Sequence, residues 1–305
     1  MSVVLHVEPC VAPMSKEEFC KTKPRNSVAL DGYVSGGPWF ENLGPFANFD
    51  HHDGCNRLAT RATCGQVLMA IRQGFFSTFI PSSKDQLHLW VNDCDEDVCL
   101  AVFLLRHGFL AKNVSNPALN RIVFMEDAMD SAVGSYPWPP DEQLAWVFEP
   151  YRKFRLTGGL ERKSVEEFVS IITDVELRIM EYILGNAGHV DVDTSYETLG
   201  GGHGWLLIRE TGSHAKTGVF GDGYRAYVSV RDRPEPEKFT YSIGKVAFFN
   251  LNMERLFVEL NVLEGTTNDQ DHWGGGDTVG GSPRVAGSRL TPAQVQDCVN
   301  RVLSL

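Results

Sequence analysis

The segment FANFDHHD, residues 46–53, places a short apolar run directly before two adjacent histidines that are flanked by aspartates. The run Phe46 to Phe49 is predicted to be a buried strand, and the tetrad Asp50-His51-His52-Asp53 follows at its carboxyl end. Imidazole and carboxylate groups both bind metals, so this local density predicts a metal site. Successive side chains of a strand point to opposite faces, so the two histidines can share one role only where the chain turns.

The tetrad lies within an alternation of predicted strands and helices. Apolar periodicity predicts strands at 46–49, 87–91 and 121–125 and helices at 63–73 and 97–107. Residues 3–7 form a further predicted strand, whereas residues 8–45 contain Pro, Gly and Asn throughout and are expected to be irregular. This alternation predicts an α/β fold, in which a mostly parallel sheet is flanked by helices.

Near residue 188 the sequence changes from long helical patterns to short strand-like segments, which predicts a second, smaller α+β domain. Long helices are expected at 141–154 and 164–184, and the apolar face of the second suits a helix that connects two domains. Short strands are then expected at 205–208, 217–220, 225–230 and 238–243, with helices at 253–263 and from Thr291 onward. We therefore expect one domain of residues 1–187 and another of residues 188–305.

The composition and charge limit the class of partner. With 43% hydrophobic and 22% charged residues, the 305-residue chain resembles ordinary globular proteins that bury a core. A formal net charge of −11 opposes a broad footprint on nucleic acid and suits a small anionic substrate that is bound through metal and a few arginines. We expect no nucleic-acid partner and leave oligomer formation open.

The seven cysteines include no CxxC pair, which argues against structural zinc and a disulfide framework and favours a reducing interior. No apolar run is long enough to span a bilayer, and the N-terminus lacks a signal-like pattern. A cytoplasmic protein without membrane attachment is therefore expected. The chain also lacks the Walker A, GxSxG and HExxH patterns, so those enzyme classes lose support.

Acidic clusters follow three of the predicted strands, at residues 50–53, 93–97 and 127–130. Ligands of parallel sheets bind beyond the carboxyl ends of the strands, so the three clusters are expected to converge. The predicted metal ligands are Asp50, His51, Asp93, Asp95 and Asp127, with Asp31 as a further candidate. Carboxylates with one or two imidazoles favour Mn²⁺, or Mg²⁺, over zinc. Two such ions, about 3.5–4 Å apart, can clamp a phosphoryl group and activate water.

A glycine-rich run at 274–281 is followed by Arg284. It is either a flexible loop or a segment whose backbone approaches an anionic ligand closely, with Gly275 and Gly276 as the candidate substrate contacts. Arg284 could pair with a phosphate through two hydrogen bonds. His203, within the glycine-rich segment 200–204, is either a substrate ligand or an ordinary loop histidine.

The motif Asp50-His51-His52, followed by a polar stretch and the predicted 63–73 helix, resembles the signature of the DHH phosphoesterase superfamily. The segment 93–95 is similar to the Asp-x-Asp motif of that family, and Asp127 would stand for its lone aspartate. The run 274–284 looks like its glycine-rich substrate motif, with Asp277 where the family usually has histidine. Here the Asp-x-Asp segment follows Asp-His-His instead of preceding it, so the resemblance implies a divergent member with an altered motif order.

The resemblance implies two domains around a cleft, a dinuclear Mn²⁺ site, and hydrolysis of a phosphoester or phosphoanhydride bond. The five predicted ligands would hold the ions, with Asp50 and Asp93 also in the catalytic set. His52 would contact the scissile phosphate or assist the leaving group. The function expected is thus a manganese-dependent phosphohydrolase that acts on a small phosphorylated or nucleotide substrate in an interdomain cleft.

Three alternatives stay open at this point. The first is a non-catalytic regulatory protein that binds a nucleotide or a metal, and the second is a nucleic-acid exonuclease. The third is a metal-free α/β protein whose acidic loops are only solvated surface.

Overall fold

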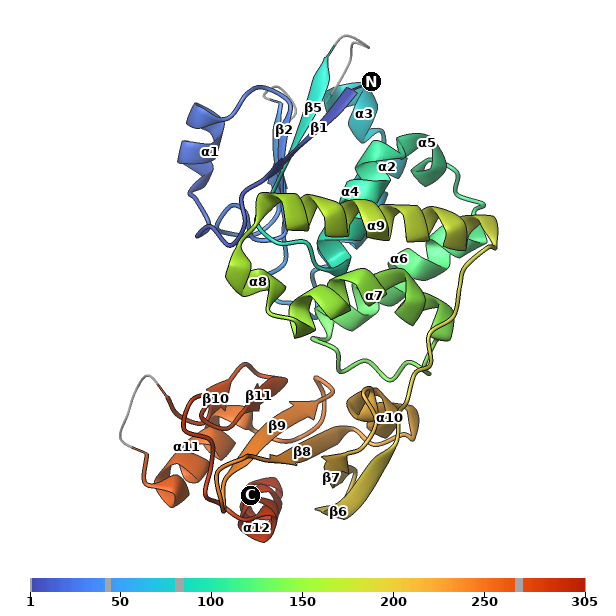
Figure 1. Ribbon diagram of the computed structural model, residues 1–305. Coiled ribbons are helices and arrows are strands. Elements are labelled where there is room, and N and C mark those ends of the chain that lie inside the picture. The colour runs from blue at the N-terminus through green and yellow to red at the C-terminus, as the bar shows by residue number, and fades with distance from the viewer. Residues whose placement is uncertain (1, 42–44, 80–84, 267–270, 305) are drawn as a thin grey trace. The chain divides into compact units, whose positions relative to one another are not determined.

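A computed structural model describes residues 2–41, 45–79, 85–266 and 271–304 of the chain. The chain divides into two compact units, which Figure 1 shows with their helices and strands labelled. The first unit comprises Met1–Ser131 and Glu142–Val190, and the second comprises Ala132–Asp141 and Asp191–Leu305. The segment Ala132–Asp141 thus groups with the second unit, although it precedes the expected boundary at 187/188. Within the described ranges, no helix is long and apolar enough to cross a membrane.

The first unit is built on a five-stranded sheet with the order β1-β5-β2-β4-β3. Its strands are β1 (Ser2–Val7), β2 (Ser27–Leu30), β3 (Trp39–Phe40), β4 (Phe46–Phe49) and β5 (Gln86–Val91). Four of them run parallel, and only the edge strand β3 pairs antiparallel, with β4. The predicted α/β class with a mostly parallel sheet is therefore confirmed. Because β2, β4 and β5 are parallel neighbours, their carboxyl ends meet at one edge of the sheet.

Helices lie on both faces of this sheet. They are α1 (Lys16–Thr22), α2 (Thr63–Arg72), α3 (Phe75–Phe79), α4 (Glu96–Arg106), α5 (Gly108–Ala111), α6 (Pro117–Ser131), α7 (Glu142–Leu156), α8 (Gly159–Arg162) and α9 (Val165–Leu184). Helix α1 packs Phe19 against Ala29 and Trp90 on one face, whereas α2, α4 and α9 lie on the other (Figure 1). Helix α4 is the centre of that layer: every residue from Asp97 to Leu105 is buried, and α2, α6 and α9 pack around it.

Two expectations for this unit are wrong. The predicted strand 121–125 lies inside helix α6, because Leu119, Ile122 and Val123 are buried at helical spacing and the side chain of Asn116 accepts a hydrogen bond from the Leu119 amide. The segment 8–45 is not irregular, because it contains α1, β2 and β3. All four residues of β2 are buried, and a strand buried on both faces lacks the alternation that reveals a strand in a sequence.

The second unit contains a six-stranded sheet with the order β10-β11-β9-β8-β7-β6. Its elements are β6 (Tyr196–Gly202), β7 (Trp205–Glu210), α10 (Ala215–Gly221), β8 (Ala226–Asp232), β9 (Phe239–Lys245), α11 (Met253–Glu264), β10 (Gly274–Gly275), β11 (Val279–Gly281) and α12 (Pro292–Leu303). Only β7 and β8 pair in parallel, and helix α10 connects them. The predicted strand 217–220 is therefore wrong, since these residues belong to α10. Helices α11 and α12 cover one face of the sheet around Trp205, Leu256 and Val299.

Candidate metal centre

The carboxyl ends of β2 and β4 bring Asp31 together with the Asp50-His51-His52 motif. Asp31 follows β2 directly with a left-handed backbone (φ 51°), and its amide donates to the carbonyl of Phe49 at the end of β4 (2.9 Å). Aspartate tolerates this conformation better than most residues. The neighbouring strand ends therefore fix the two segments against each other before any ligand is considered.

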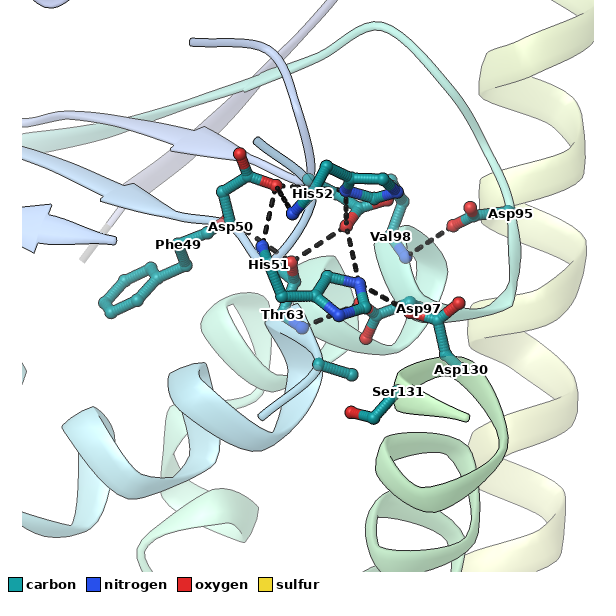
Figure 2. Close-up of polar contacts among 12 residues, drawn as sticks. Phe49, Asp50, His51, His52, Thr63, Asp95, Asp97, Val98, Asp130 and Ser131 are labelled. Atoms are coloured by element: carbon teal, nitrogen blue, oxygen red, sulfur yellow. Dashed lines mark hydrogen bonds and ion pairs between the residues drawn. The ribbon is translucent and has the colours of Figure 1, made fainter. Parts of the chain in front are cut away.

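Four side chains from separate elements converge on one point, and Figure 2 labels three of them, His51, Asp97 and Asp130. Asp31, His51, Asp97 and Asp130 each offer a ligand atom, and these atoms all lie within 4.8 Å of one another. The His51 Nε2 atom is 2.6 Å from Asp130 Oδ2, 3.6 Å from Asp31 Oδ1 and 3.8 Å from Asp97 Oδ2. Asp97 comes from the start of α4 and Asp130 from the end of α6, so the centre joins strand ends to two helices.

The imidazole of His51 is completely buried, yet neither ring nitrogen has a hydrogen-bond partner among the described residues. Asp130 Oδ2, although close, is likewise without a hydrogen bond there. Buried polar groups are nearly always hydrogen-bonded, and an unmade bond costs about 1–3 kcal/mol. A cation beside Nε2 would satisfy both atoms. Three carboxylates and one imidazole form a donor set that suits Mn²⁺, so the residues present fit the metal that the sequence indicated.

A second group of potential ligands comprises Asp31, His51 and His52. The side chain of His52 is 43% exposed, and its Nδ1 atom lies 3.4 Å from Asp31 Oδ1 and 3.0 Å from Asp50 Oδ1. This group shares Asp31 and His51 with the first, so the open side of the centre is the side of His52.

Asp50 orients both histidines. Its Oδ1 atom accepts hydrogen bonds from the backbone amides of His51 (2.7 Å) and His52 (3.0 Å) and lies beside the ring of His52. Three contacts on one oxygen hold the chain in a turn, which allows the two imidazoles to face one region (Figure 2). Burial opposes ionisation of Asp50, but the hydrogen bonds from His52 outweigh it and lower the pKa of this carboxyl. Asp50 lies outside both ligand groups and acts through the histidines.

The carboxylates of the centre repel one another. Burial, followed by the charge of Asp97, raises the pKa of Asp31 to about 7, and burial with the charge of Asp130 raises the pKa of Asp97 to about 7. The pKa of Asp130 is lowered: burial opposes ionisation, but His51 outweighs burial. The hydrogen bond to Asp50 raises the pKa of His52. Three carboxylates that face one another at these distances favour a divalent cation, whose charge would offset their repulsion.

Helix α2 positions the remaining parts of the cluster. The backbone amides of Thr63 and Cys64, at its first turn, donate to the two oxygens of Asp97 (2.7 Å each), and the Thr63 hydroxyl donates to Asp31 Oδ1 (2.9 Å). The N-terminus of a helix attracts anions. The predicted helix after the tetrad thus aims its positive end at two of the candidate ligands.

Two of the predicted ligands, Asp93 and Asp95, lie outside both groups that converge on His51. Asp95 is the N-cap of α4, where its Oδ1 atom accepts from the Val98 amide (2.9 Å), and Figure 2 shows it apart from the histidines. Asp93 accepts from the amide of Cys94 (2.6 Å). The residue of this loop that does reach His51 is Asp97.

Asp127, the fifth predicted ligand, is also elsewhere. Its two oxygens accept hydrogen bonds from the Ala62 amide and from Arg61 (2.7 Å each). Asp127 therefore caps the start of α2, although it is far from that helix in the sequence. Asp130, three residues further along α6, is the residue of this helix that faces His51. Residues three apart lie near one face of a helix, so the partners of the two carboxylates, and not their spacing, separate their roles.

In the second unit, the glycine run forms a hairpin. Gly275, in β10, has φ 157°, and a Cβ atom there would lie 2.3 Å from the carbonyl oxygen of Val279. The amide of Gly276 donates to that same carbonyl (2.8 Å). Arg284 is exposed beyond β11, and His203 is exposed in the turn between β6 and β7. Gly275 thus has a structural reason in the hairpin itself.

Comparison with known proteins adds no assignment. A scan against models of protein families finds no match, and a search of curated proteins finds no similar sequence.

Proposed function

We propose that the protein is a manganese-dependent phosphohydrolase that acts on a small phosphorylated or nucleotide substrate, as a divergent relative of the DHH phosphoesterases. The observation that carries this proposal is the buried imidazole of His51, which lacks hydrogen-bond partners among the described residues and faces three carboxylates. Acidic surface loops do not leave a buried ring unsatisfied in this way.

The ligands that would hold a metal are Asp31, His51, Asp97 and Asp130. A second ion, which the resemblance implies, would take Asp31 as a ligand on the exposed side of the centre, because the single lone pair of His51 Nε2 serves only one ion. Bound Mn²⁺ would supply positive charge for a phosphoryl group and would lower the pKa of a water molecule.

His52 is the residue best placed to meet the substrate. Asp50 holds its Nδ1 atom (3.0 Å), which leaves Nε2 to hydrogen-bond a phosphate oxygen or the departing oxygen from the exposed side of the centre. Asp50 is a positioning residue, because it fixes the orientation of this ring. Arg57 adds positive charge near the centre, since its guanidinium donates to the backbone carbonyl of Asp130 (3.1 Å).

Elemental analysis together with a substrate panel tests the proposal. Protein dialysed against Mn²⁺ is expected to retain the metal and to hydrolyse at least one of a phosphodiester, a phosphomonoester and a pyrophosphate. His51→Gln is expected to lose both properties. Asp53→Asn, which changes the exposed aspartate of the tetrad, serves as the control and is expected to keep them.

The other outcomes separate the alternatives. A metal that is retained without hydrolysis of any substrate would favour the non-catalytic regulatory protein. Stepwise degradation of a labelled oligonucleotide would favour the exonuclease, which the net charge of −11 makes the weaker hypothesis. If no metal is retained, or if His51→Gln is as active as the unaltered protein, the proposal is wrong.

A further inference from the structure

The second unit contains a cavity of about 430 Å³ that is lined by residues other than those of the glycine hairpin. It lies where the β6–β7 turn, the start of β8, the loop after β9 and the end of α12 meet. Its lining residues are His203, Arg225, Phe248, Phe249, Asn250, Asn300, Leu303 and Ser304. This volume falls within the range of about 300–1,000 Å³ that is typical of small-molecule sites.

Among the described residues, the lining of this cavity includes no carboxylate, although the chain as a whole carries a net charge of −11. The guanidinium of Arg225 lies over the ring of Phe249, 5.3 Å from its centroid, and has no ion pair within the described part of the chain. A Cβ atom on Gly204, whose φ is 80°, would lie 3.2 Å from Arg225 Nη2. The ring of Phe249 therefore positions Arg225, and glycine at position 204 leaves room for its guanidinium group. The charge of Arg225 remains available for an anion.

The loop after β9 presents an aromatic ring at the same cavity. The side chain of Phe248 is 90% exposed, whereas that of Phe249 is only 6% exposed. Lys245 is buried, and its ammonium group donates to the carbonyls of Ala247 (3.1 Å) and Phe249 (3.2 Å). Because the buried ammonium group of Lys245 holds the backbone on both sides of Phe248, the conformation of the loop keeps this ring exposed.

Polar groups complete the lining. Asn300 accepts a hydrogen bond from the Trp205 indole with its carbonyl oxygen (3.1 Å), which leaves its amide NH₂ as a donor. His203 adds a ring N–H that can donate to an oxyanion, whereas the Ser304 hydroxyl already donates to the carbonyl of Arg301 (2.8 Å). Donors and a fixed cation thus lie close to an exposed aromatic face.

We propose that this cavity binds a nucleoside monophosphate. The phosphate would pair with Arg225 through charge-assisted hydrogen bonds, with the side-chain amide of Asn300 as a further donor. The base would stack on Phe248, since aromatic rings stack on the face of any base. This site requires no metal and lies wholly within the second unit, so it goes beyond the proposed hydrolytic function.

Calorimetric titration with adenosine monophosphate tests the site in the full-length protein. The titration is made with EDTA present, so that a metal in the first unit cannot hold the phosphate. Arg225→Met is expected to weaken binding at least tenfold, and Phe248→Ala is expected to weaken it roughly tenfold through lost stacking. Arg255→Met and Val262→Ala, which remove an exposed cation and an exposed apolar side chain of α11, are the matched controls and should bind as the unaltered protein does.

Adenosine and inorganic phosphate separate the two parts of the recognition. Each is expected to bind at least tenfold more weakly than adenosine monophosphate. The proposal is overturned if inorganic phosphate binds as tightly as the nucleotide, if the controls lose as much affinity as Arg225→Met, or if the unaltered protein binds no nucleotide. Because EDTA is present throughout, failure of this site would leave the metal-dependent function untouched, and the reverse also holds.

Discussion

Asp127 and Asp130 lie one helical turn apart on α6 and have opposite environments. Both oxygens of Asp127 accept hydrogen bonds, from the Ala62 amide and from Arg61. Asp130 instead points one oxygen at His51, and neither that oxygen nor the ring is hydrogen-bonded among the described residues. One carboxylate is thus fully hydrogen-bonded within the fold, whereas Oδ2 of the other has, among the described residues, an ion pair with His51 and no hydrogen bond. A high density of acidic residues in the sequence is therefore not enough to identify a metal site. The residues that indicate one are those whose buried polar atoms lack hydrogen bonds within the fold.

The largest expected effect is on metal binding by Asp130→Asn. This change removes a charged ligand, and we expect Mn²⁺ affinity to fall by at least about 100-fold, with hydrolysis lost in parallel. Equilibrium dialysis with elemental analysis measures it. Asp127→Asn, one turn away on the same helix, should bind Mn²⁺ as the unaltered protein does. Equal losses in the two variants would erase the distinction between the two aspartates.

Gly275 and Gly276, in the hairpin of the second unit, are a second pair of neighbouring residues that differ in their surroundings. Gly275→Ala is expected to lower the free energy of unfolding by about 1–3 kcal/mol, because the backbone is strained for any side chain and its Cβ atom would meet the Val279 carbonyl. Gly276→Ala, whose Cβ atom would approach that carbonyl no closer than 4.0 Å, should change it by less than about 0.5 kcal/mol. Urea denaturation of the pair measures both values. If Gly275→Ala were as stable as Gly276→Ala, the structural explanation of the glycine would be wrong.

Asp127→Ala is expected to lower the free energy of unfolding by about 2 kcal/mol, because it removes a charged acceptor from the start of α2. Added Mn²⁺ should still stabilise this variant, by about 2.7 kcal/mol at one hundred times the dissociation constant. Thermal unfolding with and without Mn²⁺ separates the two effects. A variant that is fully stable but insensitive to Mn²⁺ would instead make Asp127 a ligand.

The smallest effect is expected at Asp95. Asp95 is the N-cap of α4, so Asp95→Ala should lower the free energy of unfolding by about 1 kcal/mol. Asp95→Asn should change it by almost nothing, because asparagine caps equally well. Both variants should retain Mn²⁺. Loss of metal from Asp95→Asn, measured by the same dialysis, would show that this residue is a ligand after all.

Much of the fold could be predicted because its strong patterns are local. The strand before the tetrad, the helix after it, and the helix at 164–184 follow from apolar periodicity and caps. Strand β2 is short and wholly buried, so it lacks the alternation that identifies a strand, and no strand end is predicted before Asp31. The short apolar segment 121–125, with Ile122 and Val123, is compatible with a strand, but it packs as a helix against α2 and α4.

The candidate site was predictable in kind and only partly in its residues. His51 and the edge of the sheet follow from the motif at the end of β4. The choice among neighbouring aspartates depends on tertiary contacts that no local pattern expresses: Asp97 and Asp130 face His51, whereas Asp95 and Asp127 cap helices.

Anomalous scattering at the manganese edge, from crystals grown with Mn²⁺, tests the central claim most directly. The account predicts a peak in contact with His51 Nε2 and with oxygens of Asp31, Asp97 and Asp130. A peak at Asp93 and Asp95 instead, or no peak while His51 stays buried and unchanged, would contradict it.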